Sequence, residues 1–180
     1  PTRRSSDLDA NRANRESLIN GYDNSIRYTD GMLADVIGAL RTVDGRAAMV
    51  YSADHGEDIF DDERNRFLHA SPHPTYYQLH VASLAWMNDS LASNRPDFAA
   101  FLTKNAGKPV SPQKSLFPTM LEMAGVSTPL LHREHSLVDS AYRYEGPVYL
   151  TDVNQCVPLH EAGIKESDRK KIDTLIRRHN

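Results

Sequence analysis

The sequence has little of several features, and each absence excludes a class of protein. A single cysteine, Cys156, in 180 residues allows neither an internal disulfide nor a thiolate metal cluster. No apolar run approaches the roughly 18 residues that a membrane-spanning helix needs, so we expect the chain itself to be soluble. With 21 Lys and Arg against 24 Asp and Glu, the formal net charge is −3, which argues against nucleic acid as a partner. The Gly-x-Ser-x-Gly elbow and the Gly-rich phosphate loop are missing, so no activated nucleophile is recognisable.

What is present fits a single globular domain. Apolar residues make up 39% and charged residues 25% of the chain, which excludes a disordered class and permits a core. Apolar positions at helical spacing predict a helix from about Asn14 to Thr42, and the apolar run 47–52 predicts a buried strand of a parallel sheet. Together these elements predict α/β layers, preceded by a flexible segment 1–12. The other expected elements are strands at 80–87 and 146–151 and helices at 97–105, 115–124 and 166–178.

The most informative stretch is Ala48-Met-Val-Tyr-Ser-Ala-Asp-His-Gly-Glu57, followed by Phe67-Leu-His-Ala-Ser-Pro72. Asp54 and His55 come directly after the predicted strand, and His69 follows 14 residues after His55. Such oxygen and nitrogen donors suit Zn²⁺, and ligands collect at the carboxyl ends of strands in α/β sheets. We therefore predict metal-dependent phosphate or sulfate ester chemistry with Asp54, His55 and His69 as metal ligands. A hydrogen-bonded polar loop at a strand end is the alternative.

Residues around this pair have expected supporting roles. Gly56 would permit the close turn that lets Asp54 and His55 face one ion. Glu57 and Asp58 would accept hydrogen bonds that orient a ligating imidazole. The four acidic residues between 58 and 63 do not match the spacing of an EF-hand loop, so we expect them to form a solvated face.

His69 has several candidate roles. It would bind a second ion, hydrogen-bond the leaving phosphate or act as a general acid, because imidazole titrates near neutral pH. A loop histidine bonded to the backbone is the alternative. Among the other histidines, we expect His73 to be exposed and His80 to lie in the core. His132 and His135 are expected in an exposed loop.

Three blocks of the sequence resemble, in this order, the C-terminal half of the catalytic domain of phosphoethanolamine transferases in the alkaline phosphatase/sulfatase superfamily. The first block is 21–30, on the predicted helix before the metal-binding strand. The second is 51–57 with 67–72, and it is the most specific. The third is 115–126, of a kind that occurs widely in sulfatases. With 76–80, the resemblance covers about Leu18 to Val126 and is thin beyond residue 130.

The resemblance implies a partial alkaline-phosphatase-like, or sulfatase-like, sheet flanked by helices. It implies zinc as the cofactor, with Asp54 and His55 as paired zinc ligands and His69 as the histidine at the phosphate or at an additional zinc. It also implies transfer of phosphoethanolamine from phosphatidylethanolamine, by way of a threonine nucleophile, to a lipid A or glycan acceptor. The implied location is the cell inner membrane, with the catalytic domain in the periplasm.

The chain departs from that family's pattern because only 53 residues precede Asp54. The nucleophile, an upstream zinc-ligating glutamate and histidine, and the membrane helices of the family have no counterpart. We therefore expect residues 1–180 to be the C-terminal part of a sulfatase-like catalytic domain, inactive alone. Missing strands would leave an apolar sheet edge for a homodimer to cover. Two alternatives stay open: a sulfatase or phosphodiesterase of the same superfamily, and a non-catalytic α/β interaction module.

Overall fold

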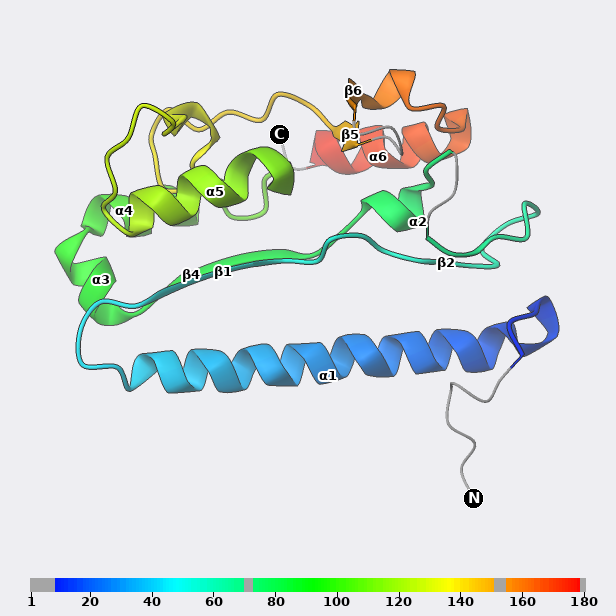
Figure 1. Ribbon diagram of the computed structural model, residues 1–180, viewed down its shortest axis with the longest axis horizontal. Coiled ribbons are helices and arrows are strands. Elements are labelled where there is room, and N and C mark those ends of the chain that lie inside the picture. Colours follow the sequence, from blue (N-terminus) through cyan, green and yellow to red (C-terminus); the bar gives the residue numbers. More distant parts are fainter. Residues whose placement is uncertain (1–8, 70–72, 151–154, 179–180) are drawn as a thin grey trace.

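The computed structural model describes residues 9–69, 73–150 and 155–178 of the chain (Figure 1). Helices and strands are mixed along the chain, so the predicted α/β class is confirmed. The helical elements are η2 Arg12–Asn14, α1 Arg15–Arg41, α2 Tyr76–Leu79, α3 Asp89–Asn94, α4 Pro96–Asn105, α5 Pro112–Met123, η3 Arg133–His135, η4 Leu159–Glu161 and α6 Glu166–Arg178. The strands are β1 Ala48–Ser52, β2 Asp58–Ile59, β3 Phe67–Leu68, β4 Ser83–Met87, β5 Val148–Leu150 and β6 Cys156–Pro158.

The long helix predicted at the start of the chain is confirmed as α1, which has 27 residues and runs below the β1–β4 pair in Figure 1. Its apolar stripe is only half-buried, and no residue of α1 is fully buried. Its first residue is anchored, because the Arg15 guanidinium donates to the Phe60 carbonyl at 2.9 Å and to Asp61 at 3.0 Å. The start of α1 is therefore tied to the turn between β2 and β3.

The central pair of strands differs from our prediction. Strand β1 pairs with β4 in antiparallel register, with Val50 opposite Ala85, so the predicted parallel pairing is wrong. Two further backbone bonds extend the pairing past the strand ends: Ala53 N–H to the Ala82 carbonyl at 3.2 Å and Gly56 N–H to the Gln78 carbonyl at 2.9 Å. The segment between the strands thus leaves and returns at the same end of β1, without the crossover that parallel strands need.

That connecting segment has more regular structure than a long loop. Strands β2 and β3 form a short antiparallel hairpin in which Phe60 and Phe67 stack with ring centroids 5.4 Å apart. Helix α2 follows, and the Thr75 side chain caps it by accepting a hydrogen bond from the Gln78 N–H. The hairpin and α2 hold the segment that carries the candidate metal ligands.

A small core lies on the side of β1 opposite α1 (Figure 1). Helix α5 packs against β1, and Phe98 of α4 and Val138 are each only 1% exposed. The buried Thr119 hydroxyl donates to the Ser115 carbonyl and accepts from the Leu137 N–H, so this buried hydroxyl has partners for both its donor and its acceptor role. The helices predicted at 97–105 and 115–124 are confirmed as α4 and α5, whereas α3 was not predicted.

In Figure 1 the C-terminal elements lie on the same side of the β1–β4 pair as α5. The strand predicted at 146–151 is present as β5, with residue 151 outside the described residues, and it pairs with β6, which was not predicted. The terminal helix is confirmed as α6. Of the segment expected to be flexible, residues 1–8 lie outside the described residues, and η2 begins at Arg12. Within the described part of the chain, no helix is both long and apolar enough to cross a membrane.

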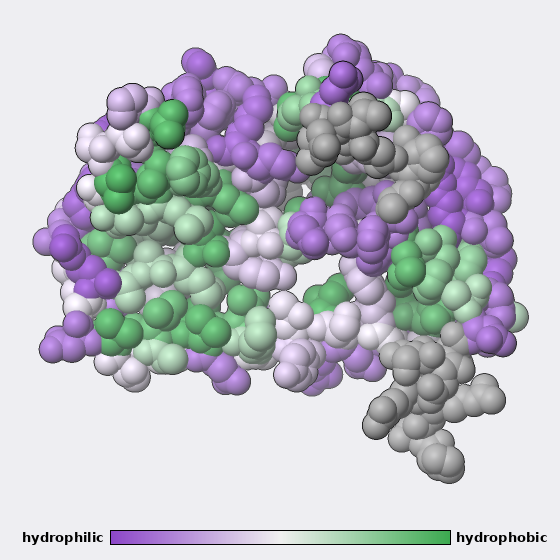
Figure 2. All heavy atoms as spheres, viewed as in Figure 1, coloured by the Kyte–Doolittle hydropathy of each residue, from purple (hydrophilic) through white to green (hydrophobic). Residues whose placement is uncertain are grey.

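Apolar side chains gather on one face of the molecule. Figure 2 shows this patch extending over α5, the β1–β4 pair and α1. The exposed apolar side chains of these elements include Met32 and Val36 of α1, Leu84 of β4, and Phe117 and Met120 of α5. Contiguous exposed apolar patches of this kind occur where a protein meets another polypeptide, a membrane or a ligand.

Candidate metal centre

The candidate ligands follow β1 directly. The strand ends at Ser52, and Asp54, His55 and Glu57 come in the next five residues, at the end where the chain turns towards β2. His69 comes directly after β3, which pairs with β2. The hairpin therefore brings the residues after β1 and the residue after β3 to one place.

Two imidazoles and a carboxylate converge there. One possible ligand atom from each of His55, Glu57 and His69 lies within 4.8 Å of the others. The His55 and His69 ring centroids are 3.9 Å apart, and His69 Nδ1 is 2.9 Å from Glu57 Oε1. Two histidines and a carboxylate are a known zinc ligand set, so the donors present fit this metal.

Asp54 stands at the edge of this group. Its Oδ2 lies 3.7 Å from His55 Nε2, and its Oδ1 accepts a hydrogen bond from the His55 N–H. That backbone hydrogen bond, followed by the nearby imidazoles, lowers the pKa of Asp54. The side chain is 88% exposed, so it is free to turn towards the cluster. Asp54 as a metal ligand therefore stays a prediction, and the contact of Glu57 with His69 Nδ1 fits the orienting role expected for Glu57.

Asp58 does not orient an imidazole or face solvent, so both expectations for it are wrong. It is 3% exposed and accepts hydrogen bonds from the Thr75 hydroxyl at 2.7 Å and from the Gln78 amide. The other acidic residues of the run are also engaged: Asp61 by Arg15, Asp62 by Arg64 and Glu63 by Lys165. A buried carboxylate needs such donors, and here they lock the metal-binding loop onto α2.

Gly56 is required by a close backbone approach. A Cβ atom at this position would lie 2.1 Å from the Tyr77 carbonyl oxygen. The glycine lies between His55 and Glu57, so it sets these side chains against the backbone of α2. Our expectation was a tight turn, whereas the observed reason is contact with another segment.

Backbone strain marks the residue before His69. Leu68 has φ +65°, and Phe60 and Asn65 of the same hairpin also have positive φ. Branched or bulky side chains rarely adopt this conformation, and such strain concentrates at functional sites. The hairpin therefore holds Leu68, the residue before His69, in a conformation that a leucine side chain does not favour.

Sequence reasoning missed one residue beside the cluster. Burial and then the negative charge of Glu57 raise the pKa of the Tyr22 hydroxyl, which α1 brings to this site. The signal was available, because Tyr22 belongs to the first block of the family resemblance. Its position links that block to the metal-binding loop.

The remaining histidines lie outside the cluster. His73 is exposed, as predicted, but the expectation of a core position for His80 is wrong because it too is exposed. His80 Nδ1 is 3.1 Å from the Tyr76 hydroxyl. His132 is exposed at the start of η3, and its ring centroid lies 6.1 Å from that of the half-buried His135.

A mixed α/β fold with an imidazole–carboxylate cluster after a strand defines a candidate divalent-metal protein. A model of the family "Sulfatase" matches residues 1–126, and the chain belongs to this family. The first block, the metal-binding loop, α2 and α5 all lie within the matched residues. The predicted sulfatase-like fold is thereby confirmed.

Curated relatives share a more specific activity. The chain is 33% identical over 120 residues to Kdo(2)-lipid A phosphoethanolamine 7''-transferase of Escherichia coli, covering 64% of this chain and 20% of that protein. It is 33% identical over 118 residues to phosphoethanolamine transferase EptA of Salmonella typhimurium, covering 63% of this chain and 21% of that protein. The chain therefore spans about a fifth of the length of these relatives.

Solved structures agree with the fold. The C-terminal periplasmic domain of phosphoethanolamine transferase EptC from Campylobacter jejuni matches with TM-score 0.63 and 28% identity, over 80% of this chain and 43% of that one. The corresponding domain of EcEptC from Escherichia coli, in a complex with Zn, matches with TM-score 0.69 and 21% identity, over 83% of this chain and 42% of that one. The predicted resemblance to phosphoethanolamine transferases is confirmed.

Proposed function

We propose that this chain is the C-terminal part of the catalytic domain of a zinc-dependent phosphoethanolamine transferase. The observation that carries the proposal is the convergence of His55, Glu57 and His69 at the end of β1. Relatives named as phosphoethanolamine transferases support the choice of reaction within the sulfatase family. The donor would be a phospholipid such as phosphatidylethanolamine, and the acceptor lipid A or a glycan.

In each of the two imidazoles, His55 and His69, one ring nitrogen is in hydrogen-bond contact with another group of the protein. His55 Nδ1 lies 3.1 Å from the Gly56 carbonyl, and His69 Nδ1 lies 2.9 and 3.2 Å from the two Glu57 carboxylate oxygens. We assign the Nδ1 proton to both rings, which leaves each Nε2 as a donor atom for zinc. Asp54 would supply a third ligand, with Glu57 orienting His69.

Bound zinc would stabilise negative charge on the phosphoryl oxygens and lower the pKa of a bound nucleophile. The chain's own residues would do the rest at this site. Glu57 would hold the His69 ring in place, and His69 would bind the metal or give a proton to the departing group. The attacking threonine of the family has no assigned counterpart in this chain, so we propose that residues 1–180 alone do not transfer phosphoethanolamine.

The location and assembly follow the same proposal. The solved domains of EptC are periplasmic by their descriptions, and we propose a periplasmic catalytic domain of an inner-membrane enzyme here as well.

A second copy of the chain is the proposed cover for the apolar patch and the unpaired edges of the β1–β4 pair. Multi-angle light scattering would give the mass of a dimer, and Val36→Glu would return the mass of a monomer.

Isothermal titration calorimetry with zinc at neutral pH tests the proposal. The wild-type chain should bind zinc with a Kd in the micromolar range or tighter, and binding should be lost in Asp54→Ala/His55→Ala and in His69→Ala. The matched control is His132→Ala/His135→Ala, which removes two histidines outside the cluster and should leave the affinity unchanged. Equal affinities in all variants would reject the metal centre and favour the non-catalytic interaction module.

Hydrolysis is the second candidate, because the matching family model is that of sulfatases as a whole. The intact protein that contains this segment should be incubated with labelled phosphatidylethanolamine and a lipid A acceptor. Label on the acceptor would support transfer, whereas release to water, or cleavage of a sulfate ester instead, would support the hydrolase.

A further inference from the structure

A buried ion pair joins the C-terminal helix to the β2–β3 hairpin. Asp168 of α6 is 1% exposed, and its Oδ2 lies 2.8 Å from Arg64 Nη2 in the turn of the hairpin. The Arg64 side chain is only 10% exposed, and its Nε donates to Asp62 at 2.6 Å. One guanidinium thus connects the turn of the hairpin to a helical residue 104 positions further along the chain.

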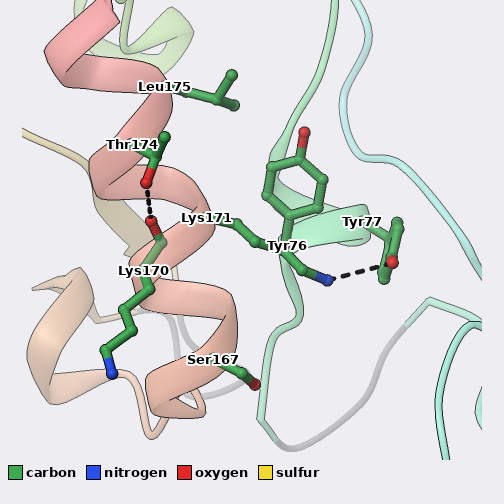
Figure 3. Close-up of a pocket in the computed structure, with 7 residues that line it drawn as sticks. All are labelled: Tyr76, Tyr77, Ser167, Lys170, Lys171, Thr174 and Leu175. Carbon is green, nitrogen blue, oxygen red and sulfur yellow. Dashed lines mark hydrogen bonds between the residues drawn. The ribbon is translucent and has the colours of Figure 1, made fainter.

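The second oxygen of Asp168 faces a cation that reaches another element. Lys171 Nζ lies 3.7 Å from Asp168 Oδ1 and donates to the Tyr77 hydroxyl of α2 at 3.2 Å, across the groove between the two helices (Figure 3). Both oxygens of this buried carboxylate are therefore balanced by positive charge, as a carboxylate withdrawn from water requires. Through the two cations, Asp168 is connected to the hairpin and to α2.

The C-terminal segment contacts the chain on both sides of His69. Arg64 precedes this histidine on the hairpin, and His73 follows it. A Cβ atom at Gly163 would lie 2.4 Å from His73 Nδ1, so the absence of a side chain lets the segment before α6 pack directly against this imidazole. His69 therefore lies, in sequence, between two points that the C-terminal segment contacts.

The hairpin needs such outside contacts. It has only two residue pairs, and a two-stranded hairpin is at best marginally stable in water. His69 and Glu57 meet at its open end, next to the pairing of Asp58 with Leu68. The positive φ of Leu68 adds strain there, which persists only where surrounding structure enforces it. What holds the hairpin therefore also sets the contact between His69 and Glu57.

We propose that Asp168 is a positioning residue of the metal centre. Through Arg64 it holds the β2–β3 hairpin so that His69 stays against Glu57 and the second ring nitrogen of His69 stays directed at the ion. Helix α6 lies outside residues 1–126, so the match to the family model assigns it no role. This inference rests on the proposed function, because it names a residue that supports the zinc ligand His69.

Calorimetry with zinc tests the inference in Asp168→Asn, in Arg64→Gln and in the double variant. Each single variant should weaken zinc binding about tenfold, at the lower end of the effects of residues that orient metal ligands. The double variant should lose no more than the weaker single variant, because all three remove one contact. A merely structural role would lower the number of zinc sites, through loss of folded chain, at an unchanged Kd. An unchanged Kd in both single variants would overturn the inference.

The matched control is Lys165→Gln, which removes an exposed ion pair between the same two segments. Lys165 Nζ lies 3.1 Å from Glu63 Oε1, and the two side chains are 48% and 80% exposed, so water screens their charges. Zinc affinity in this variant should stay within about twofold of the wild type. Equal losses in Lys165→Gln and Asp168→Asn would show that any charge between the segments suffices, and would overturn the role of Asp168.

If Asp168→Asn does not fold, Arg64→Lys provides the test. It keeps a positive charge beside the two aspartates, but a single ammonium group replaces the planar fork that spans Asp62 and Asp168. We expect zinc binding several-fold weaker than in the wild type, and wild-type affinity would overturn the inference.

Two further measurements separate this inference from the proposed function. If His69→Ala loses zinc but Asp168→Asn binds it like the wild type, the positioning role fails and the metal centre stands. If the wild type does not bind zinc, the proposed function fails, and nuclear magnetic resonance of the His69 ring in the zinc-free chain decides the positioning role. Asp168→Asn should then shift this ring from the Nδ1-protonated form towards the tautomer mixture of a free imidazole, and Lys165→Gln should not. An unshifted ring in Asp168→Asn would overturn the role.

Discussion

Glu57 and His69 are twelve residues apart in the sequence, and their side chains meet at 2.9 Å. Both carboxylate oxygens of Glu57 lie within 3.2 Å of the same imidazole nitrogen. The contact is possible because β2 and β3 pair between the two residues and turn the chain back on itself. A side chain held in this way presents its second ring nitrogen in a fixed direction, which suits a metal ligand.

Removing the charge of Glu57 should weaken zinc binding. Glu57→Gln keeps an oxygen for the His69 Nδ1–H but loses the carboxylate, and we expect zinc affinity to fall about 10- to 100-fold, as for other residues that orient metal ligands. Calorimetry with zinc measures the change. Glu63→Gln is the control, because Glu63 is exposed and pairs with Lys165 away from the cluster. An unchanged affinity in Glu57→Gln would contradict the role given to this carboxylate.

Adding a methyl group at Gly56 should destabilise the fold. Gly56→Ala places a Cβ 2.1 Å from the Tyr77 carbonyl oxygen, so the loop or α2 must move, at a cost of at least about 1–3 kcal/mol in the free energy of unfolding. Chemical denaturation measures this cost. Gly31→Ala, in the middle of α1 with nothing near its Cβ position, should instead stabilise by roughly 0.5–1 kcal/mol. Similar effects of the two substitutions would refute the close approach.

Replacing the Thr75 hydroxyl should loosen α2 from the metal-binding loop. Thr75→Val removes the N-terminal cap of α2 and a hydrogen bond to the buried Asp58, and we expect a loss of about 1–3 kcal/mol in the free energy of unfolding. Thr103→Val, on the exposed face of α4, should cost less than about 1 kcal/mol. If thermal denaturation ranks the two variants the other way, the Asp58 contacts do not stabilise the loop.

The Asp62–Arg64 pair should make stability depend on acid pH. The side-chain hydrogen bond from Arg64 lowers the pKa of Asp62 from 3.8 to about 2 in the folded state. The unfolded chain therefore binds a proton first as the pH falls, so the stabilisation is complete above pH 3.8 and is lost towards pH 2.

Asp62→Asn tests this dependence. The variant should have a lower free energy of unfolding than the wild type at pH 6. The difference should shrink between about pH 4 and 2, the range set by the pKa of Asp62 in the unfolded chain (3.8) and in the folded state (about 2). Urea denaturation at several pH values gives the two curves. A constant difference across this range would show that Asp62 acts through packing rather than through its charge.

Local patterns in the sequence were enough to locate the main helices and the strand β1. The repeat of apolar residues in α1, the proline and charge pattern of α4 and the amphipathic α6 are properties of neighbouring residues, so each helix could be located before the fold was known. The same holds for β1, since a short apolar run between polar turns is a local signal. The placement of Asp54, His55 and His69 near one another also followed from the motif and its family resemblance.

The tertiary structure decided what those signals contact. The antiparallel pairing of β1 and β4 depends on where the chain between them returns, which no local pattern encodes. Asp58 belongs to an acidic run whose pattern predicts a solvated surface. In the folded chain it is buried and accepts hydrogen bonds from Thr75 and Gln78. Gly56 and Tyr77, and likewise Arg64 and Asp168, are brought together by folding alone. The sequence therefore determined which chemical groups the site contains, and long-range packing decided which of them meet.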